Sequence, residues 1–71
     1  MPMVHVNLIK DAFDDNEKQQ LLSKITEVFE SIKGEDFRQL VTVLIHEVES
    51  GHVAKAGNQV TLDKVREYEH A

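Results

Sequence analysis

The sequence has 71 residues, no cysteine, and a net charge of −5 that arises from eight basic and thirteen acidic residues. We therefore expect one domain over residues 1–71, without disulfides or thiolate metal sites, and without nucleic acid as a partner because no basic stripe is present to neutralise phosphates. A core this small rarely supplies more than about 3 to 5 kcal/mol, so association with other chains is the expected source of further stability.

The first predicted element is a strand over residues 3–9 (MVHVNLI), in which apolar and polar side chains alternate. One face carries Val4, Val6 and Leu8, and the other carries His5 and Asn7. The strand therefore has one face suited to a core and a second face of different chemistry.

A helix is predicted to follow. Asp14 with Glu17 three residues later is an acidic variant of the capping box, which marks a helix start. Apolar residues then recur at helical spacing as far as Ile32, and Gly34 stands where a left-handed residue would end the helix. The helix has about 19 residues, which is long enough to cross over between two parallel strands.

Residues 40–45 (LVTVLI) predict a second strand, and their apolar character at five of six positions indicates burial on both faces. One amphipathic helix covers only one face of a two-stranded sheet, so the other face must meet another copy or another partner. The expected fold class is α+β, a small β-α-β unit with parallel strands that assembles as an oligomer.

The pattern weakens after Glu47. Turn chemistry at Ser50-Gly51-His52 and at Ala56-Gly57-Asn58 predicts a short C-terminal hairpin or arm. Residues 61–71 predict a short helix capped by Thr61 or a frayed tail, and their apolar spacing favours the helix.

Several familiar site motifs are incomplete. His46-Glu47 opens like a zinc-protease motif, but Ser50 replaces its second histidine. Residues 11–22 are acid-rich yet lack the alternating ligands and central glycine of a calcium loop. We expect no metal and no cofactor, because no two histidines share a spacing that would place them on one helix face. The histidines are His5, His46, His52 and His70.

The apolar runs are of strand length, well below the ~18 residues of a membrane span. The first residues lack the basic segment and apolar stretch of a signal peptide. We therefore expect a cytoplasmic protein without a membrane partner.

Pro2 carries the most unusual chemistry. A proline after the initiator methionine usually permits cleavage of Met1, which would leave a secondary amine at the head of a strand. A free α-amino group has a pKa near ~7.7 to 8.0, and an apolar pocket lowers that pKa by disfavouring the charged form. A base tuned near the working pH is what proton abstraction beside a carbonyl requires. Many proteins begin Met-Pro for no catalytic reason, so the surrounding pattern must support this interpretation.

The order of elements resembles the 4-oxalocrotonate tautomerase family over nearly the whole chain. The segments that carry the resemblance are residues 2–6 (PMVHV), 14–33, 41–47 (VTVLIHE) and 51–52. The resemblance implies a homo-oligomer, a hexamer, that acts without a cofactor as an isomerase. Such a keto–enol tautomerase shifts a proton in a small enol or dienol carboxylic acid.

The resemblance also implies roles for single residues. Pro2, after Met1 removal, is the general base. Ile9 and Leu44 match apolar positions that line the family's pocket, and Val53 takes the place of an aromatic residue after Gly-His.

Two cationic positions of the family are changed. The best-studied members place arginines where this sequence has Ala12 and Thr42. Lys10 is our candidate to bind the substrate carboxylate in their place. Further cations near the predicted strand ends are Arg38 and Lys55.

Two other functions stay open. The same scaffold can act as a hydratase, dehalogenase or decarboxylase, with Glu47 or Glu49 as the carboxylate that activates water. The chain can also be a non-catalytic subunit that pairs with an arginine-bearing homologue in a mixed oligomer, or a small binding module.

Overall fold

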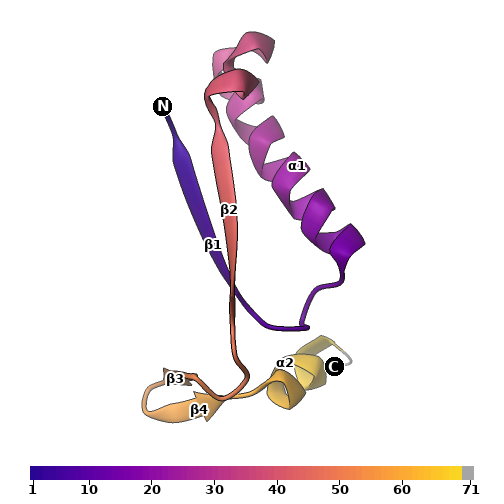
Figure 1. Ribbon diagram of the computed structural model, residues 1–71, viewed down its shortest axis with the longest axis vertical. Helices are drawn as coiled ribbons and strands as arrows, with labels where there is room; N and C mark the ends of the chain where they lie inside the picture. Colours follow the sequence, from indigo (N-terminus) through magenta and orange to yellow (C-terminus); the bar gives the residue numbers. More distant parts are fainter. Residues whose placement is uncertain (70–71) are drawn as a thin grey trace.

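The computed structural model describes residues 1–69 and shows a β-α-β unit followed by a hairpin and a second helix (Figure 1). Strands β1 and β2 pair in parallel, and β3 and β4 pair antiparallel. The predicted α+β class with a C-terminal hairpin is confirmed. The elements are β1 Met3–Ile9, α1 Asp15–Lys33, a 3₁₀ helix Glu35–Leu40, β2 Thr42–Val48, β3 Val53–Lys55, β4 Asn58–Val60 and α2 Leu62–Glu69.

Helix α1 begins where the capping box predicts. The Asp14 side chain accepts the N–H of Glu17 at 2.8 Å, and the Glu17 side chain accepts the N–H of Asp14 at 3.0 Å. At the other end Gly34 has a φ of 105° and a ψ of 162°. The prediction that Gly34 ends the helix with a positive φ is confirmed, but its ψ is extended rather than left-handed helical, and the chain turns directly into the 3₁₀ helix, which the sequence did not indicate.

Strand β2 lies further along the chain than the apolar run predicts. Leu40 belongs to the 3₁₀ helix, and the strand continues to Val48. The apolar pattern did not predict this continuation, because His46 and Glu47 are polar. Both residues nevertheless pair with β1, His46 with Asn7 and Glu47 with Leu8. A ladder is built from backbone hydrogen bonds, so polar side chains need not end it.

The two faces of the β1–β2 sheet differ. Val4 lies beside Val43, and Val6 lies beside Ile45. Glu47 shares their side of the sheet and bonds Lys18 of α1, which identifies this face as the one that α1 covers. We call the opposite face the helix-free face; its residues are Met3, His5, Asn7, Ile9, Thr42, Leu44, His46 and Val48.

The C-terminal part forms the predicted hairpin. Ala56 and Gly57 have φ values of 51° and 79°, which is the backbone of a two-residue hairpin turn. Helix α2 follows Thr61, whose hydroxyl accepts the N–H of Lys64 at 3.4 Å. His70 and Ala71 lie outside the described residues.

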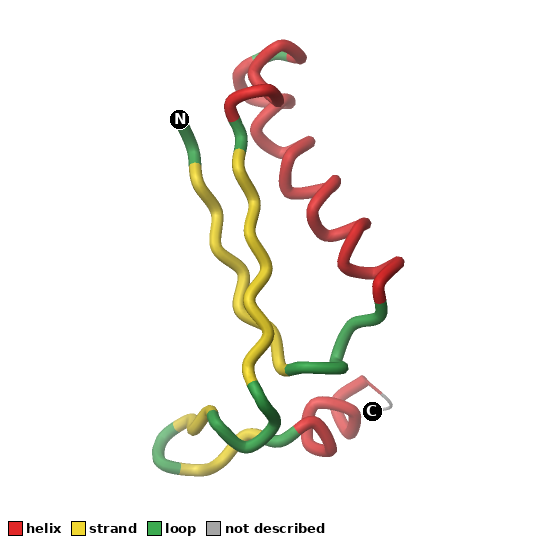
Figure 2. The backbone as a smooth tube through the Cα atoms, in the orientation of Figure 1, coloured by secondary structure: helices red, strands yellow, loops and turns green. Residues whose placement is uncertain are grey.

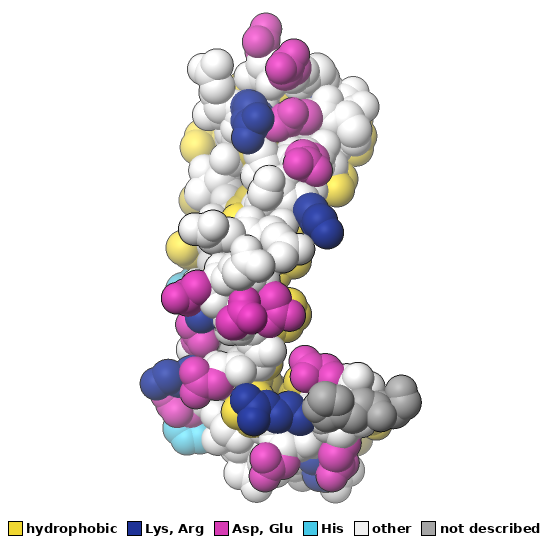
Figure 3. All heavy atoms as spheres, turned by 90° about the vertical axis from the view of Figure 1, so that its right-hand side faces the viewer, with side chains coloured by type: hydrophobic (Ala, Val, Ile, Leu, Met, Phe, Trp, Pro, Cys, Tyr) yellow, Lys and Arg dark blue, Asp and Glu magenta, His cyan; other side chains and the backbone are white. Residues whose placement is uncertain are grey.

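None of residues 1–69 is fully buried. The chain exposes 5602 Å², whereas a compact monomer of this length would expose about 4,500 Å². Its radius of gyration is 14.8 Å against about 11 Å for a compact domain, since the hairpin and α2 extend away from the β-α-β unit (Figure 2). Seen from the α1 side, charged side chains dominate and apolar ones emerge along both edges (Figure 3). The chain alone therefore leaves apolar surface open that a compact monomer would enclose.

Within the described part of the chain, no helix combines the length and apolar character that crossing a bilayer needs.

Candidate functional site

Pro2 lies at the edge of the sheet where both parallel strands begin. It is half-buried, and its carbonyl accepts the N–H of Thr42 at 3.1 Å. Met1 is 85% exposed, so little packing would be lost with its removal. While Met1 is attached, the Pro2 nitrogen is an amide nitrogen without basicity. Only the chain that lacks Met1 can offer a basic amine at this position.

Exposed apolar side chains lie toward the end of the sheet where Pro2 stands. Met3 and Leu44 share the helix-free face and are 66% and 43% exposed. Leu40, at the end of the 3₁₀ helix that leads into β2, is 50% exposed. We call these three side chains the apolar rim; in one chain they are open to solvent, so water would be excluded from this end of the sheet only if another surface closed over it.

The residues that the sequence assigned to one site fall into two groups. Leu44 lies in the half of the sheet that is nearer to Pro2, whereas Ile9 and Lys10 stand at the far end of β1. At ~3.3 Å per residue, the distance from Pro2 to this far end is about 25 Å. Val53 begins the hairpin beyond the end of β2, also at the far end (Figure 1). One chain therefore does not bring the five predicted residues together.

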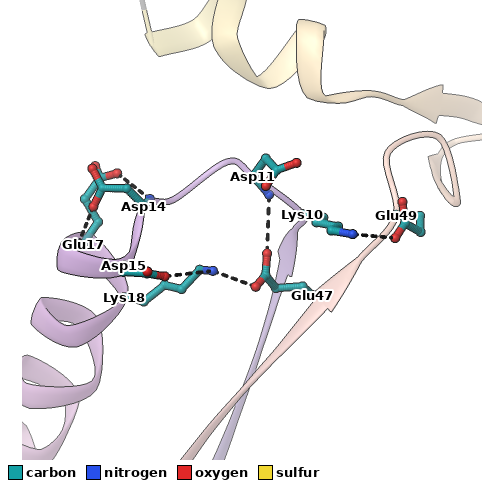
Figure 4. Close-up of polar contacts among 8 residues, drawn as sticks. All are labelled: Lys10, Asp11, Asp14, Asp15, Glu17, Lys18, Glu47 and Glu49. Carbon is teal, nitrogen blue, oxygen red and sulfur yellow. Dashed lines mark hydrogen bonds and ion pairs between the residues drawn. The ribbon is translucent and has the colours of Figure 1, made fainter.

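The far end holds a cluster of ion pairs (Figure 4). Lys18 Nζ lies 2.6 Å from Glu47 Oε1, and the Asp11 N–H donates to Glu47 Oε2 at 3.4 Å. The hydrogen bond with Lys18 lowers the pKa of Glu47, helped by the Asp11 N–H, and the same bond raises the pKa of Lys18. Glu47 is thus an ionised acceptor that is already engaged, which makes it a poor base for activating water.

The second pair of this cluster joins Lys10 and Glu49. Their charged atoms are 3.4 Å apart, and their side chains are 55% and 62% exposed. An exposed pair of this kind contributes little to stability and breaks readily. Lys10 is therefore available to another anion that competes with Glu49.

Arg38 is the candidate cation on the Pro2 side of the sheet. It lies in the 3₁₀ helix just before Thr42, and its Nε is 3.2 Å from Glu30 Oε1. That contact lacks hydrogen-bond geometry, since Glu30 Oε1 is enclosed without a hydrogen-bond partner. The remaining N–H groups of the guanidinium can still bind a carboxylate. Lys55, in β3, belongs to the far end.

The sequence did not predict that two histidine side chains would lie close together. The rings of His5 and His46 have centroids 5.9 Å apart with an interplanar angle of 36°. The two residues come from different strands, and His46 pairs directly with Asn7 rather than with His5. The contact depends on the register of β1 against β2, whereas the sequence argument considered only two histidines on the same face of one helix. Across residues 1–69, no group of three or more potential ligands gathers to hold a metal ion.

A hollow of about 460 Å³ lies between the hairpin and α2. Val60 and Val65 contribute apolar lining, and Lys55 and Lys64 contribute charge. It contains none of the five residues that the sequence assigned to the site. Pro2 therefore has no connection with this hollow within one chain.

Comparison with known proteins places these observations in context. A family model described as tautomerase enzyme matches residues 2–63. The structure of a candidate 4-oxalocrotonate tautomerase from methicillin-resistant Staphylococcus aureus matches with a TM-score of 0.70 and 31% identity, over 82% of this chain and 90% of that one. The structure of YwhB, a homologue of 4-oxalocrotonate tautomerase, matches with a TM-score of 0.70 and 29% identity, over 87% and 95%. No curated protein matches the sequence significantly.

Proposed function

This chain belongs to the tautomerase family, and on that premise we propose that it is a keto–enol tautomerase that uses the amine of Pro2 as general base. The resemblance that the sequence indicated is confirmed for family and fold. The observation that carries the proposal is the position of Pro2, held at the head of β1 by the Thr42 N–H at the end of the sheet toward which the apolar rim lies.

The proposed reaction moves one proton. The neutral Pro2 amine accepts the proton of the enol hydroxyl of a small enol or dienol carboxylic acid, so that an N–H bond forms as the O–H bond breaks. The electrons of the O–H bond form the carbonyl, and the carbon–carbon double bond shifts. The ammonium then returns its proton to the substrate carbon that gains electron density. No cofactor takes part, and the amine is regenerated.

The proposed site needs a second copy of the chain. Pro2 and Leu44 lie at one end of the sheet, while Ile9, Lys10 and Val53 lie at the other end, about 25 Å away. A neighbouring copy that brings its far end to this Pro2 would complete the group. It would also close the apolar rim and thereby lower the pKa of the amine. We propose a homo-oligomer, a hexamer by analogy with the family.

The substrate carboxylate needs a cation in this proposal. Lys10 of the neighbouring copy is our assignment, because its pairing with Glu49 is exposed and exchangeable. Arg38 of the same chain as Pro2 is the rival, since it precedes the residue that pairs with Pro2. The two assignments differ in which copy supplies the charge.

Of the other functions, the hydratase is less well supported for Glu47, which Lys18 holds in a close pair, whereas Glu49 remains its candidate carboxylate because its pair with Lys10 is exposed and exchangeable. A non-catalytic subunit of a mixed oligomer is the remaining alternative, favoured by Ala12 and Thr42 at the two changed positions. Neither residue can bind a carboxylate as arginine does.

One experiment separates these proposals. The purified chain is first weighed by intact mass spectrometry to establish whether Met1 is absent, and is then assayed for ketonisation of 2-hydroxymuconate and phenylenolpyruvate. Turnover by the chain alone, lost on Pro2→Ala substitution, is the expected result. A processed, oligomeric chain without turnover on either substrate would instead support the non-catalytic subunit.

A further inference from the structure

The helix-free face has a polar centre between two apolar ends. Met3 and Leu44 lie toward the Pro2 end, and Ile9 and Val48 close the other end. Between them stand His5 and His46, with ring centroids 5.9 Å apart. The remaining residues of the face, Thr42 and Asn7, are uncharged. The charge of the face therefore depends on its two histidines alone.

The two ion pairs at the far end of the sheet lie off this face. Lys18 and Glu47 pair on the side that α1 covers, and Lys10 and Glu49 pair beyond the strand ends (Figure 4). His5 and His46 themselves are exposed, as are Met3, Asn7 and Leu44. Among the residues of the helix-free face, His5 and His46 are the titratable ones, and their rings lie 5.9 Å apart.

A second copy of the chain is the expected occupant of this face, and this expectation rests on the oligomer of the proposed function. The whole chain exposes about 1,000 Å² more than a compact monomer of its length, in part because the hairpin and α2 extend away from the sheet, and a standard interface covers ~800 Å² of each partner. Chains with a net charge of −5 repel one another, and a face without fixed charge is where two copies approach at least electrostatic cost.

We infer that His5 and His46 make this contact between copies sensitive to acid, so that the assembly forms while both imidazoles are neutral and separates when they bind protons. Histidine is the side chain whose charge changes within the physiological pH range. Two imidazolium rings at the observed spacing repel each other, and covering them with another chain removes the water that solvates their charge.

The direction of the effect follows from proton binding. If separated chains bind more protons than assembled chains, assembly is expected to weaken as the pH falls through the range in which these histidines take up protons. For each histidine that must stay neutral in the contact, the dissociation constant of the assembly rises ~10-fold per pH unit at pH values where that histidine is protonated in the separated chains. A site built from two copies would lose activity over the same range.

Sedimentation velocity at pH 7.5, 6.5 and 5.5, at constant ionic strength, tests the inference. The wild-type chain is expected to dissociate at pH 5.5, whereas the His5→Gln/His46→Gln double variant is expected to stay assembled there. His52→Gln is the matched control, because His52 lies in the turn before β3 and outside this face; it should dissociate like the wild type. A wild-type assembly that persists at pH 5.5 overturns the inference, as does a double variant that still dissociates.

The outcomes separate this inference from the proposed function. A wild-type chain that is monomeric at pH 7.5 overturns the proposed oligomer and the inference together, whereas an oligomer that ignores acid overturns only the inference. If the double variant does not assemble, heats of dilution of the wild type in two buffers of different ionisation enthalpy count the protons bound on dissociation. Proton uptake at pH 6.5 supports the role of the histidines, and dissociation without uptake overturns it.

Discussion

Thr42 donates its backbone N–H to the carbonyl of Pro2 at 3.1 Å. This bond extends the parallel ladder one residue beyond β1 and fixes the proposed base to the start of β2. The bond uses only main-chain atoms, so it does not depend on which side chain stands at position 42. The anchoring of Pro2 and the recognition of a carboxylate are therefore separate properties of this site, and one can be kept while the other is altered.

The amine of Pro2 should carry most of the catalysis. Pro2→Ala is expected to lower kcat/KM by about 10² to 10⁴, the usual effect of removing a general base. The matched preparation keeps Pro2 but carries an N-terminal extension, so that its nitrogen remains an amide; it should be equally inactive. Both are compared with the wild type by steady-state ketonisation assays, with circular dichroism to verify the fold. Full activity in the extended chain would exclude the amine as base.

A site shared between copies predicts complementation. Pro2→Ala removes the base at one end of the sheet, and Lys10→Ala removes the proposed cation at the other. Refolding the two inactive variants together in equal amounts should restore about a quarter of the sites, because some neighbouring ends are then both intact. Activity of the mixture is measured against each variant alone.

Arg38→Ala provides the control for this complementation. Arg38 lies on the Pro2 side of the same chain, so it contributes to the same half of a shared site. If Arg38 is the cation, Arg38→Ala is inactive and its mixture with Pro2→Ala stays inactive, whereas the Lys10→Ala variant is active by itself. That result would reassign carboxylate binding from Lys10 to Arg38.

The Lys18–Glu47 pair should make stability depend on pH within a defined window. The pKa of Glu47 is lowered from its usual 4.5, so its contribution is present above that pH and is lost as the pH falls through the lowered value. The pKa of Lys18 is raised from 10.5, so its contribution is lost as the pH rises through the raised value. Glu47→Gln is therefore expected to be less stable than the wild type at pH 7 and equally stable near pH 3.

Urea unfolding at the two pH values measures this difference. Glu49→Gln is the matched control, since its partner Lys10 is mostly exposed and the pair is expected to contribute little. A Glu47→Gln chain that matches the wild type at pH 7 would show that the pair has no net effect on the free energy of unfolding.

Replacing Gly34 should destabilise the chain, and the reason is the backbone conformation of this residue alone. Its φ of 105° with a ψ of 162° lies in a region that other residues rarely enter, and a Cβ there would meet nothing within 4 Å. Gly34→Ala is therefore expected to cost about 1 to 3 kcal/mol through strain rather than through a clash. Chemical denaturation measures the loss, and Glu35→Ala in the next residue should change stability much less. A Gly34→Ala chain of unchanged stability would mean that the backbone relaxes.

The sequence predicted what depends on neighbours along the chain. The alternation in β1, the capping box at Asp14 and the hairpin turn at Gly57 are local patterns, and the structure contains all of them. The end of β2 was missed because polarity at His46 describes the side chain and not the ladder. The histidine contact was missed because it depends on the register of two strands separated by a helix.

The candidate site was harder to predict for a different reason. We assigned Pro2, from the family resemblance, and Lys10, as the candidate replacement for the missing arginines, to one site, although one chain separates them by about 25 Å. No pattern within a sequence states which copy of a chain supplies a residue. The predicted residues therefore identify the parts of the proposed site, while their arrangement depends on contacts that lie outside a single chain.

The separation of Pro2 from Lys10 along β1 also bears on how such a protein can diverge. If each chain contributes one end to each of two sites, then after gene duplication neither copy has to conserve the residues of both ends. One paralogue can preserve the proline end while its arginines are lost, and the other can preserve the cationic end. A mixed ring built from the two would then retain a working site that neither gene encodes by itself.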